Sequence, residues 1–125
     1  MTTGAPRVLI VDDEPSMVEL IRATLEVDGF DVVGVATDGT EAVHCFDDLA
    51  PPPSAVVLDQ RMPGLSGLEA AELILERHPP QMVILFSAAL SDELVTLALN
   101  AGVQQCVDKL EVRRLPRVLR TLLGV

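Results

Sequence analysis

Three carboxylates stand directly after two aliphatic runs of the chain. Asp12 and Asp13 follow residues 8–11, and Asp59 follows residues 55–58. If both runs are strands of one parallel sheet, the acids meet at one edge, because ligands of open α/β sheets bind outside the carboxyl ends of strands. Carboxylates this close repel one another by about 4 kcal/mol per pair at about 4 Å and an effective dielectric near 20, so a cation is expected among them. Oxygen ligands that leave room for water suit Mg²⁺, which commonly works with phosphate, so the acids indicate phosphoryl chemistry.

The elements that must position these acids are predicted from hydrophobic periodicity. Short aliphatic runs typical of strands alternate with longer segments in which apolar residues recur at helical spacing. This alternation predicts an α/β fold: a doubly wound, five-stranded parallel sheet with right-handed crossovers and five helices on its two faces. The strands are expected at residues 7–11, 31–35, 54–58, 82–86 and 104–107.

Helix boundaries follow from capping residues and prolines. The third helix is expected from about Leu65 to His78, because two prolines directly after it stop it before the next strand. One face of the fourth helix is expected to be buried, and it consists of Leu94, Leu97, Ala98 and Ala101. The starts of the remaining helices are marked by Pro15, Asp38, Ser91 and Pro116.

Length and composition indicate one cytoplasmic domain. The chain has 125 residues, of which 49% are apolar, and no linker or repeat divides it, so we expect a single domain over residues 1–125. No apolar stretch approaches the roughly 20 residues of a membrane span, and the start of the chain lacks the apolar segment of a signal peptide. Cys45 and Cys106 have no metal-ligand spacing, which favours reduced packing residues.

Charge is unevenly distributed along the chain. Residues 1–60 hold 2 basic and 12 acidic side chains, whereas residues 61–125 hold 7 of each, which accounts for the net charge of −10. The acidic half disfavours polyanions, and no recognition motif accompanies the arginines, so direct nucleic-acid binding is not expected. Two interpretations remain open for the arginine-rich end: a solvated helix face, or a docking surface for an acidic partner. Its arginines are Arg113, Arg114, Arg117 and Arg120.

Five segments lie at the predicted strand ends and helix starts: VDDEP at 11–15, DGTEA at 38–42, LDQRMPGLSG at 58–67, FSA at 86–88 and VDK at 107–109. Together they resemble the receiver domain of two-component response regulators, and the resemblance covers essentially the whole chain. It implies a flavodoxin-like fold with strand order 2-1-3-4-5. It also implies a protein that accepts a phosphoryl group from a sensor histidine kinase or a phosphotransfer protein and then controls an output domain or partner.

The resemblance assigns roles to the acids. Asp59 matches the phosphoacceptor, a carboxylate nucleophile that attacks the phosphohistidine of the donor. Asp13 and Asp59 would bind Mg²⁺ directly together with the backbone carbonyl of Arg61, and Asp12 would act through a metal-bound water. The cofactor is thus Mg²⁺, and the activity is self-phosphorylation and autodephosphorylation at Asp59 without conventional substrate turnover.

Two further side chains match family positions at the ends of strands. Lys109 would pair with the phosphoryl oxygens, and Ser87 would donate a hydrogen bond to them. The surface of the fourth helix, fifth strand and fifth helix would dimerise or dock an output domain. Taken singly, the residues have simpler interpretations: Asp12 and Asp13 as helix caps, Ser87 as a turn hydroxyl and Lys109 as surface charge.

The chain departs from the family pattern at two positions. Cys106 stands where receivers usually carry an aromatic ring that turns inward on phosphorylation, and Leu110 follows Lys109 where the family usually has proline. These departures keep open an alternative, a receiver-like docking module that needs no phosphorylation. A third possibility, a Mg²⁺-dependent phosphatase of small esters, usually requires a second acid two residues after the nucleophile, where this chain has Arg61.

Overall fold

The computed structural model describes residues 4–125 and contains five strands, five α-helices and one 3₁₀ segment, η1. The strands begin and end within one residue of the predicted positions. In chain order the elements are β1 (Arg7–Val11), α1 (Pro15–Val27), β2 (Asp31–Ala36), α2 (Gly39–Asp48), β3 (Ala55–Leu58), α3 (Gly67–Arg77), β4 (Met82–Ser87), α4 (Asp92–Ala101), β5 (Gln105–Asp108), η1 (Lys109–Arg114) and α5 (Leu115–Leu123).

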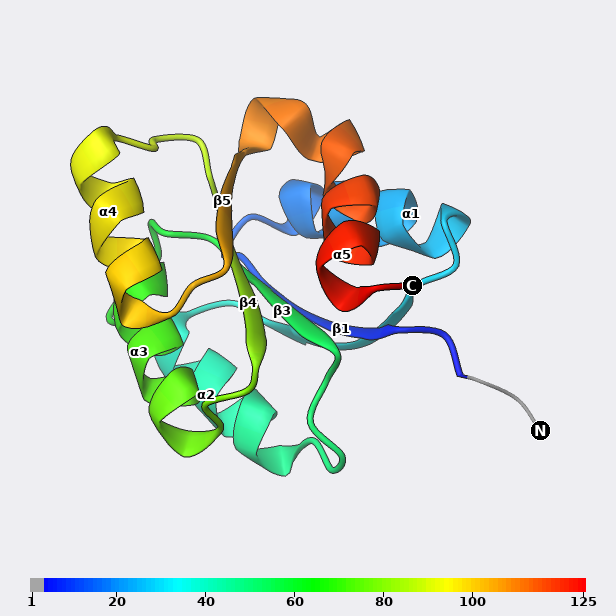
Figure 1. Cartoon of the computed structure of the whole chain (residues 1–125), viewed down its shortest axis with the longest axis horizontal. Coiled ribbons are helices and arrows are strands. Elements are labelled where there is room, and N and C mark those ends of the chain that lie inside the picture. Colours follow the sequence, from blue (N-terminus) through cyan, green and yellow to red (C-terminus); the bar gives the residue numbers. More distant parts are fainter. Residues whose placement is uncertain (1–3) are drawn as a thin grey trace.

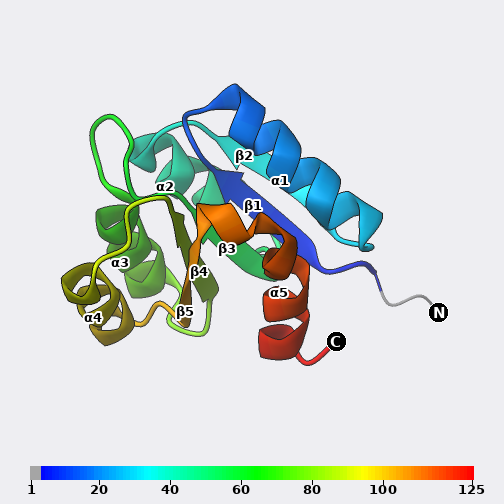
Figure 2. The same ribbon diagram turned by 90° about the horizontal axis from the view of Figure 1, so that it is seen from above.

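All strand pairs are parallel, and the sheet order is β2-β1-β3-β4-β5, as predicted (Figure 1). Helices α1 and α5 cover one face of the sheet, and α2, α3 and α4 cover the other (Figure 2). The doubly wound α/β architecture is therefore confirmed. Because both faces are covered, β3 is buried along its whole length and β1 and β4 along all but their first residue, which explains their continuous aliphatic sequences.

Alternate side chains of each strand enter two separate cores. On β1, Val8 and Ile10 pack toward α1 and α5, whereas Leu9 and Val11 pack toward α2 and α3. This alternation is the period-two pattern of a strand, so the backbone at the end of β1 is fixed from both sides. The backbone that carries the acids after this strand is therefore held rigidly in place.

The predicted caps of α2 and α4 are confirmed. Asp38 accepts a hydrogen bond from the Glu41 amide at 2.7 Å, and Ser91 accepts one from the Leu94 amide at 3.1 Å. Helix α3 begins at Gly67, two residues after the predicted start, because Ser66 is its cap. Ser66 and Glu69 form a reciprocal capping box that fixes this start.

The predicted buried face of α4 is wrong in its extent. Leu97 is 50% exposed, and only Ala98 is fully buried within the helix. Helix α4 packs against α3 and β5 at the end of the sheet, so its neighbours cover a narrower stripe than the apolar periodicity suggests. Leu94 and Ala101 are half-buried at the margins of that stripe.

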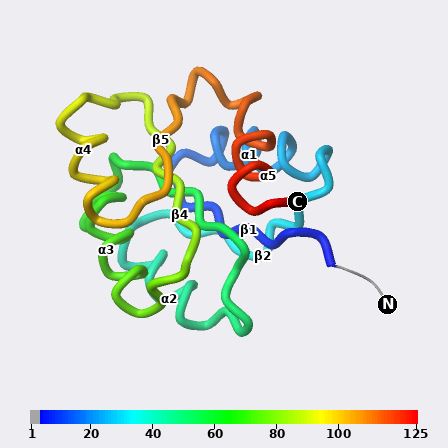
Figure 3. Tube along the Cα trace, viewed as in Figure 1, coloured from blue at the N-terminus to red at the C-terminus, as the bar shows by residue number. Residues whose placement is uncertain are grey.

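Three of the four arginines at the end of the chain line one hollow beside α1, namely Arg113, Arg117 and Arg120, whereas Arg114 does not line it. Arg113 and Arg114 lie in η1, and Arg114 pairs with Glu111 at 3.0 Å. Arg120 donates a hydrogen bond to Asp28 Oδ2 at 2.9 Å, and its guanidinium lies 4.9 Å from the centre of the Phe30 ring. This Arg120 clamp ties α5 to the turn after α1, and Figure 3 shows the two helices side by side.

Two further expectations concern the cysteines and membranes. Cys45 and Cys106 are free thiols, and both are half-buried against the core beneath α2, α3 and α4, which confirms their prediction as reduced packing residues. Over residues 4–125, no helix is long and apolar enough to cross a membrane.

Candidate functional site

The three acids lie together at the carboxyl edge of the sheet. The ladder of hydrogen bonds continues past the strand ends, because the Asp12 amide donates to Ala36 O at 3.0 Å and the Asp59 amide donates to Val11 O at 2.8 Å. One carboxylate oxygen from each of Asp12, Asp13 and Asp59 lies within 4.8 Å of the others. Asp12 and Asp59 are buried, whereas Asp13 is exposed. The cluster thus opens to solvent on the side of Asp13.

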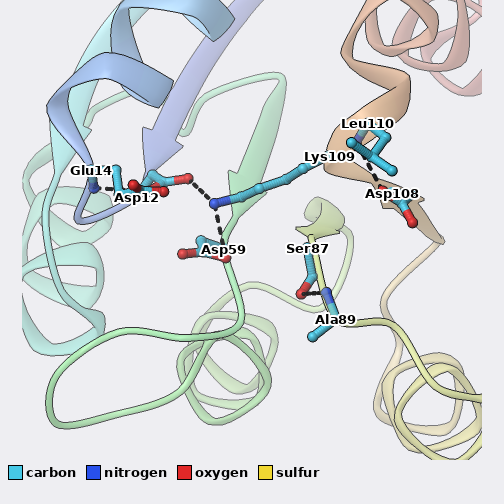
Figure 4. Close-up of polar contacts among 8 residues, drawn as sticks. All are labelled: Asp12, Glu14, Asp59, Ser87, Ala89, Asp108, Lys109 and Leu110. Atoms are coloured by element: carbon cyan, nitrogen blue, oxygen red, sulfur yellow. Dashed lines mark hydrogen bonds and ion pairs between the residues drawn. The ribbon is translucent and has the colours of Figure 1, made fainter.

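Lys109 supplies a cation to the two buried acids. Its Nζ lies 2.6 Å from Asp12 Oδ2 and 3.3 Å from Asp59 Oδ1, and its side chain is only 9% exposed (Figure 4). Burial disfavours the ammonium, but its hydrogen bonds and charge interactions with Asp12 and Asp59 outweigh this, so the pKa of Lys109 is raised. Lys109 is therefore a charged ammonium at neutral pH.

For Asp59, in contrast to Lys109, burial has a larger effect on the pKa than the charge interactions with neighbouring groups. Burial and then the Asp12 charge raise the pKa of Asp59, while Lys109 and a backbone hydrogen bond from Arg61 lower it only in part. One ammonium thus compensates the buried negative charge incompletely. A second cation is the physical remedy for such a cluster, and hard oxygen donors of this kind suit Mg²⁺.

Asp12 is not the cap of α1. The N-cap residue of this helix is Glu14, and no side chain accepts a capping hydrogen bond there. Instead, Asp12 Oδ1 accepts a hydrogen bond from the Glu14 amide at 2.9 Å, which fixes the carboxylate. The other oxygen, Oδ2, is fully buried and pairs with the Lys109 ammonium at 2.6 Å. Both oxygens of Asp12 are therefore engaged, and the cluster that Asp12 forms with Asp13 and Asp59 has the oxygen donors that fit a cation.

Ser87 ends β4 beside the acids. It is 1% exposed, and its Oγ accepts a hydrogen bond from the Ala89 amide at 3.1 Å (Figure 4). Accepting this bond leaves the hydroxyl hydrogen for donation to another group. A hollow of about 370 Å³ lies next to this hydroxyl, and it is lined by Ser87, Arg61, Lys109 and Asp59. The hollow can admit a small anion between the hydroxyl and the ammonium.

The structure thus brings together every side chain that the sequence places at the strand ends. Gln60 is a residue of this region that the sequence analysis missed: its Oε1 accepts a hydrogen bond from the Leu68 amide at 2.8 Å. Nothing in the local sequence identifies that pairing. The cap of α3, by contrast, has a local sequence signal, because Ser66 and Glu69 have the S-x-x-E spacing of a capping box.

A family model described as the response regulator receiver domain matches residues 8–120. The chain belongs to this family. Phosphorylation-based signalling is the standard function of receiver domains, and they bind Mg²⁺ at an acidic site such as the cluster of Asp12, Asp13 and Asp59. The resemblance found in the sequence is confirmed.

Curated relatives include single receivers and longer proteins. The chain is 36% identical to chemotaxis protein CheY of Treponema pallidum, over 85% of the chain and 74% of that protein. It is 38% identical to protein-glutamate methylesterase/protein-glutamine glutaminase 3 of Hahella chejuensis over 76% of the chain. It spans only 27% of that relative and 32% of a second such protein, from Myxococcus xanthus. The receiver therefore corresponds to one part of these longer proteins.

Solved structures show the same fold. A chain of the CheX–CheY–BeF₃–Mg²⁺ complex of Borrelia burgdorferi superposes with a TM-score of 0.89 at 29% identity, covering 93% of this chain and 87% of that one. The response regulator domain of Thermotoga maritima CheB gives 0.87 at 28% identity, covering 97% and 98%. The flavodoxin-like receiver fold is thus confirmed.

Proposed function

We propose that Asp59 is the phosphoacceptor of this receiver. The observation that carries the proposal is the position of its carboxylate, which belongs to the acid cluster and lies 3.3 Å from the ammonium of Lys109. An Asp59 oxygen would attack the phosphorus of a phosphohistidine, forming the O–P bond while the P–N bond breaks and the imidazole leaves with the electron pair. The donor would be a sensor histidine kinase or a phosphotransfer protein.

Mg²⁺ would be held by Asp13, Asp59 and the backbone carbonyl of Arg61. Asp12 would lie in the outer sphere, because its Oδ2 is occupied by Lys109 and its Oδ1 by the Glu14 amide. When bound, Mg²⁺ neutralises negative charge on the transferring phosphoryl group. The exposure of Asp13 supports this assignment, since it leaves the cluster open to solvent and to a hydrated ion.

Lys109 and Ser87 would hold the phosphoryl group once it is attached. Lys109 Nζ is already 3.3 Å from Asp59 Oδ1, so a phosphoryl group on Asp59 would lie beside the ammonium. The Ser87 hydroxyl lines the same hollow and would donate its free hydrogen to a phosphoryl oxygen. Donation would draw the loop after β4 toward the phosphate and bias one of two loop arrangements.

The response would reach a partner through the surface of α4, β5 and α5. Helix α4 exposes Leu97 and Leu99 by about half, which gives this surface an apolar component for a second copy or an output domain. Cys106 on β5 has no ring to turn inward, so the signal would pass through the loop from Ser87 to α4.

The test is intact-mass spectrometry after incubation with Mg²⁺ and acetyl phosphate. We expect one added phosphoryl group on the wild type and on Asp108→Asn, a matched control at the end of β5 outside the acid cluster. We expect none on Asp59→Asn or in the presence of a chelator. Equal addition to Asp59→Asn would contradict the assignment. No addition to folded, Mg²⁺-binding wild type would favour the docking module that needs no phosphate.

A further inference from the structure

The loop between β3 and α3 is closed at its base by two hydrogen bonds. The Gly67 amide donates to the backbone oxygen of Gln60 at 3.0 Å, and the Leu68 amide donates to the side-chain oxygen of Gln60 at 2.8 Å. Arg61, whose carbonyl we assign to Mg²⁺, is the residue directly after this closure. Its position therefore depends on how Gln60 is held.

We infer that Gln60 is a positioning residue for the metal site. Its amide oxygen ties the end of β3 to the first turn of α3 and thereby constrains Arg61, whose carbonyl the proposed function assigns to Mg²⁺. The inference rests on the proposed function, because it assumes that the Arg61 carbonyl binds Mg²⁺. Partners that orient metal ligands from behind contribute to metal affinity although they do not touch the ion.

The helix itself does not depend on Gln60. Helix α3 is capped by Ser66, which accepts from the Glu69 amide at 3.1 Å, while Glu69 accepts from the Ser66 amide at 2.9 Å. Gln60 adds a bond to a further amide of the same turn, from a residue six positions before the cap. Losing that bond would leave the helix capped and the backbone bond from Gly67 to Gln60 in place, and it would loosen the loop at Gln60 and Arg61.

Packing fixes the other parts of the loop. A Cβ on Gly67 would overlap the backbone oxygen of Asp59, so the start of α3 lies directly against the phosphoacceptor residue. At the far end, a Cβ on Gly39 at the start of α2 would lie 2.5 Å from the Cβ of Leu65, so this part of the loop is packed too. Arg61 lies on the near side, where the half-buried side chain of Gln60 makes its bond.

The substitution Gln60→Met tests the inference, because methionine has similar length and no charge but cannot accept this bond. The control is Gln104→Met: Gln104 Oε1 accepts a hydrogen bond from the Val83 amide at 2.7 Å, at the opposite end of the sheet. The control thus removes the same kind of bond far from the acids, together with the bond that Gln104 Nε2 donates to Gln81 O at 3.1 Å. Both variants are first checked for folding by circular dichroism.

Mg²⁺ affinity is measured by titrating isotope-labelled protein with MgCl₂ and following amide chemical shifts. We expect Gln60→Met to bind Mg²⁺ about tenfold more weakly than the wild type, and Gln104→Met to bind it equally well. With acetyl phosphate, the Mg²⁺ concentration for half-maximal phosphorylation should rise by the same factor for Gln60→Met. The rate at saturating Mg²⁺ should return to the wild-type value, which a general loss of structure would not allow.

Two results would overturn the inference, and they differ from each other. If Gln60→Met binds Mg²⁺ like the wild type while the wild type is phosphorylated, Gln60 does not position the site and the proposed function stands. If wild type and Gln104→Met neither bind Mg²⁺ nor accept a phosphoryl group, the proposed function fails, and the inference fails with it.

Discussion

Lys109 compensates two buried carboxylates, so its replacement by methionine tests the electrostatics of the site. Coulomb attraction at an effective dielectric near 20 is about 6 kcal/mol to Asp12 at 2.6 Å and about 5 kcal/mol to Asp59 at 3.3 Å. The cost of removing these charges from water offsets most of that attraction. Asp12 and Asp59 repel each other by at least about 3.5 kcal/mol, because their oxygens lie within 4.8 Å, and without Lys109 no ammonium offsets this repulsion.

We therefore expect Lys109→Met to lower the free energy of unfolding by about 4 kcal/mol in metal-free solution at neutral pH, as for other broken buried ion pairs. For a domain of this size the melting temperature should fall by about 15 °C. The raised pKa of Lys109 means that its stabilisation is present throughout neutral pH and is lost only above the ordinary lysine range. The deficit of the variant should shrink as pH falls, because the unpaired carboxylates then take up protons.

The assay is urea unfolding followed by circular dichroism, since the chain has no Trp or Tyr. Arg114→Met is the matched control: it removes an exposed pair with Glu111 and should cost under about 1 kcal/mol. Saturating Mg²⁺ should narrow the deficit of Lys109→Met, because a bound cation replaces the lost ammonium. Equal unfolding midpoints for the two variants without Mg²⁺ would refute the reasoning.

Three other predictions follow from the same geometry. Because burial and Asp12 raise the pKa of Asp59, its ionised form costs stability above the unfolded pKa; Asp59→Asn should raise the metal-free urea midpoint at neutral pH, and the gain should vanish in acid. Arg61 lines the hollow as a second cation, so Arg61→Ala should shorten the lifetime of the phosphoryl group, and coinciding decay rates would disprove this. Gly67→Ala should lower the free energy of unfolding by about 1–3 kcal/mol in the same urea assay, because its Cβ would overlap Asp59 O; an unchanged midpoint would contradict the close approach.

Strand ends could be predicted from the sequence because their chemistry depends on one rule. Once residues 8–11 and 55–58 are taken as neighbouring parallel strands, Asp12 and Asp59 must meet, and the structure places their oxygens within 4.8 Å of each other. The caps at Asp38 and Ser91 were equally local, because a cap and its amide lie three residues apart. Such features need no knowledge of distant contacts.

Features that depend on distant contacts could not be predicted. Periodicity places Leu97 on the same face as Ala98, but only the positions of α3 and β5 decide how much of that face is covered. Arg120 looked like part of a basic surface, yet its partner Asp28 lies 92 positions earlier in the chain. Gln60 reaches an amide eight positions on, across a loop whose shape the sequence does not determine.

The two faces of the sheet hold their outer helices with unequal strength. Helix α5 buries Leu115 and Leu119 completely and is tied down by the Arg120 clamp, whereas Asp92–Ala101 contains one fully buried side chain, Ala98. Local opening costs the free energy of the apolar surface that it exposes, so α4 has low local stability. Amides of α4 would then exchange with solvent through small fluctuations, and those of α5 only through larger ones. The α4 side of the molecule can therefore rearrange at a small cost in free energy, while the α5 side stays fixed.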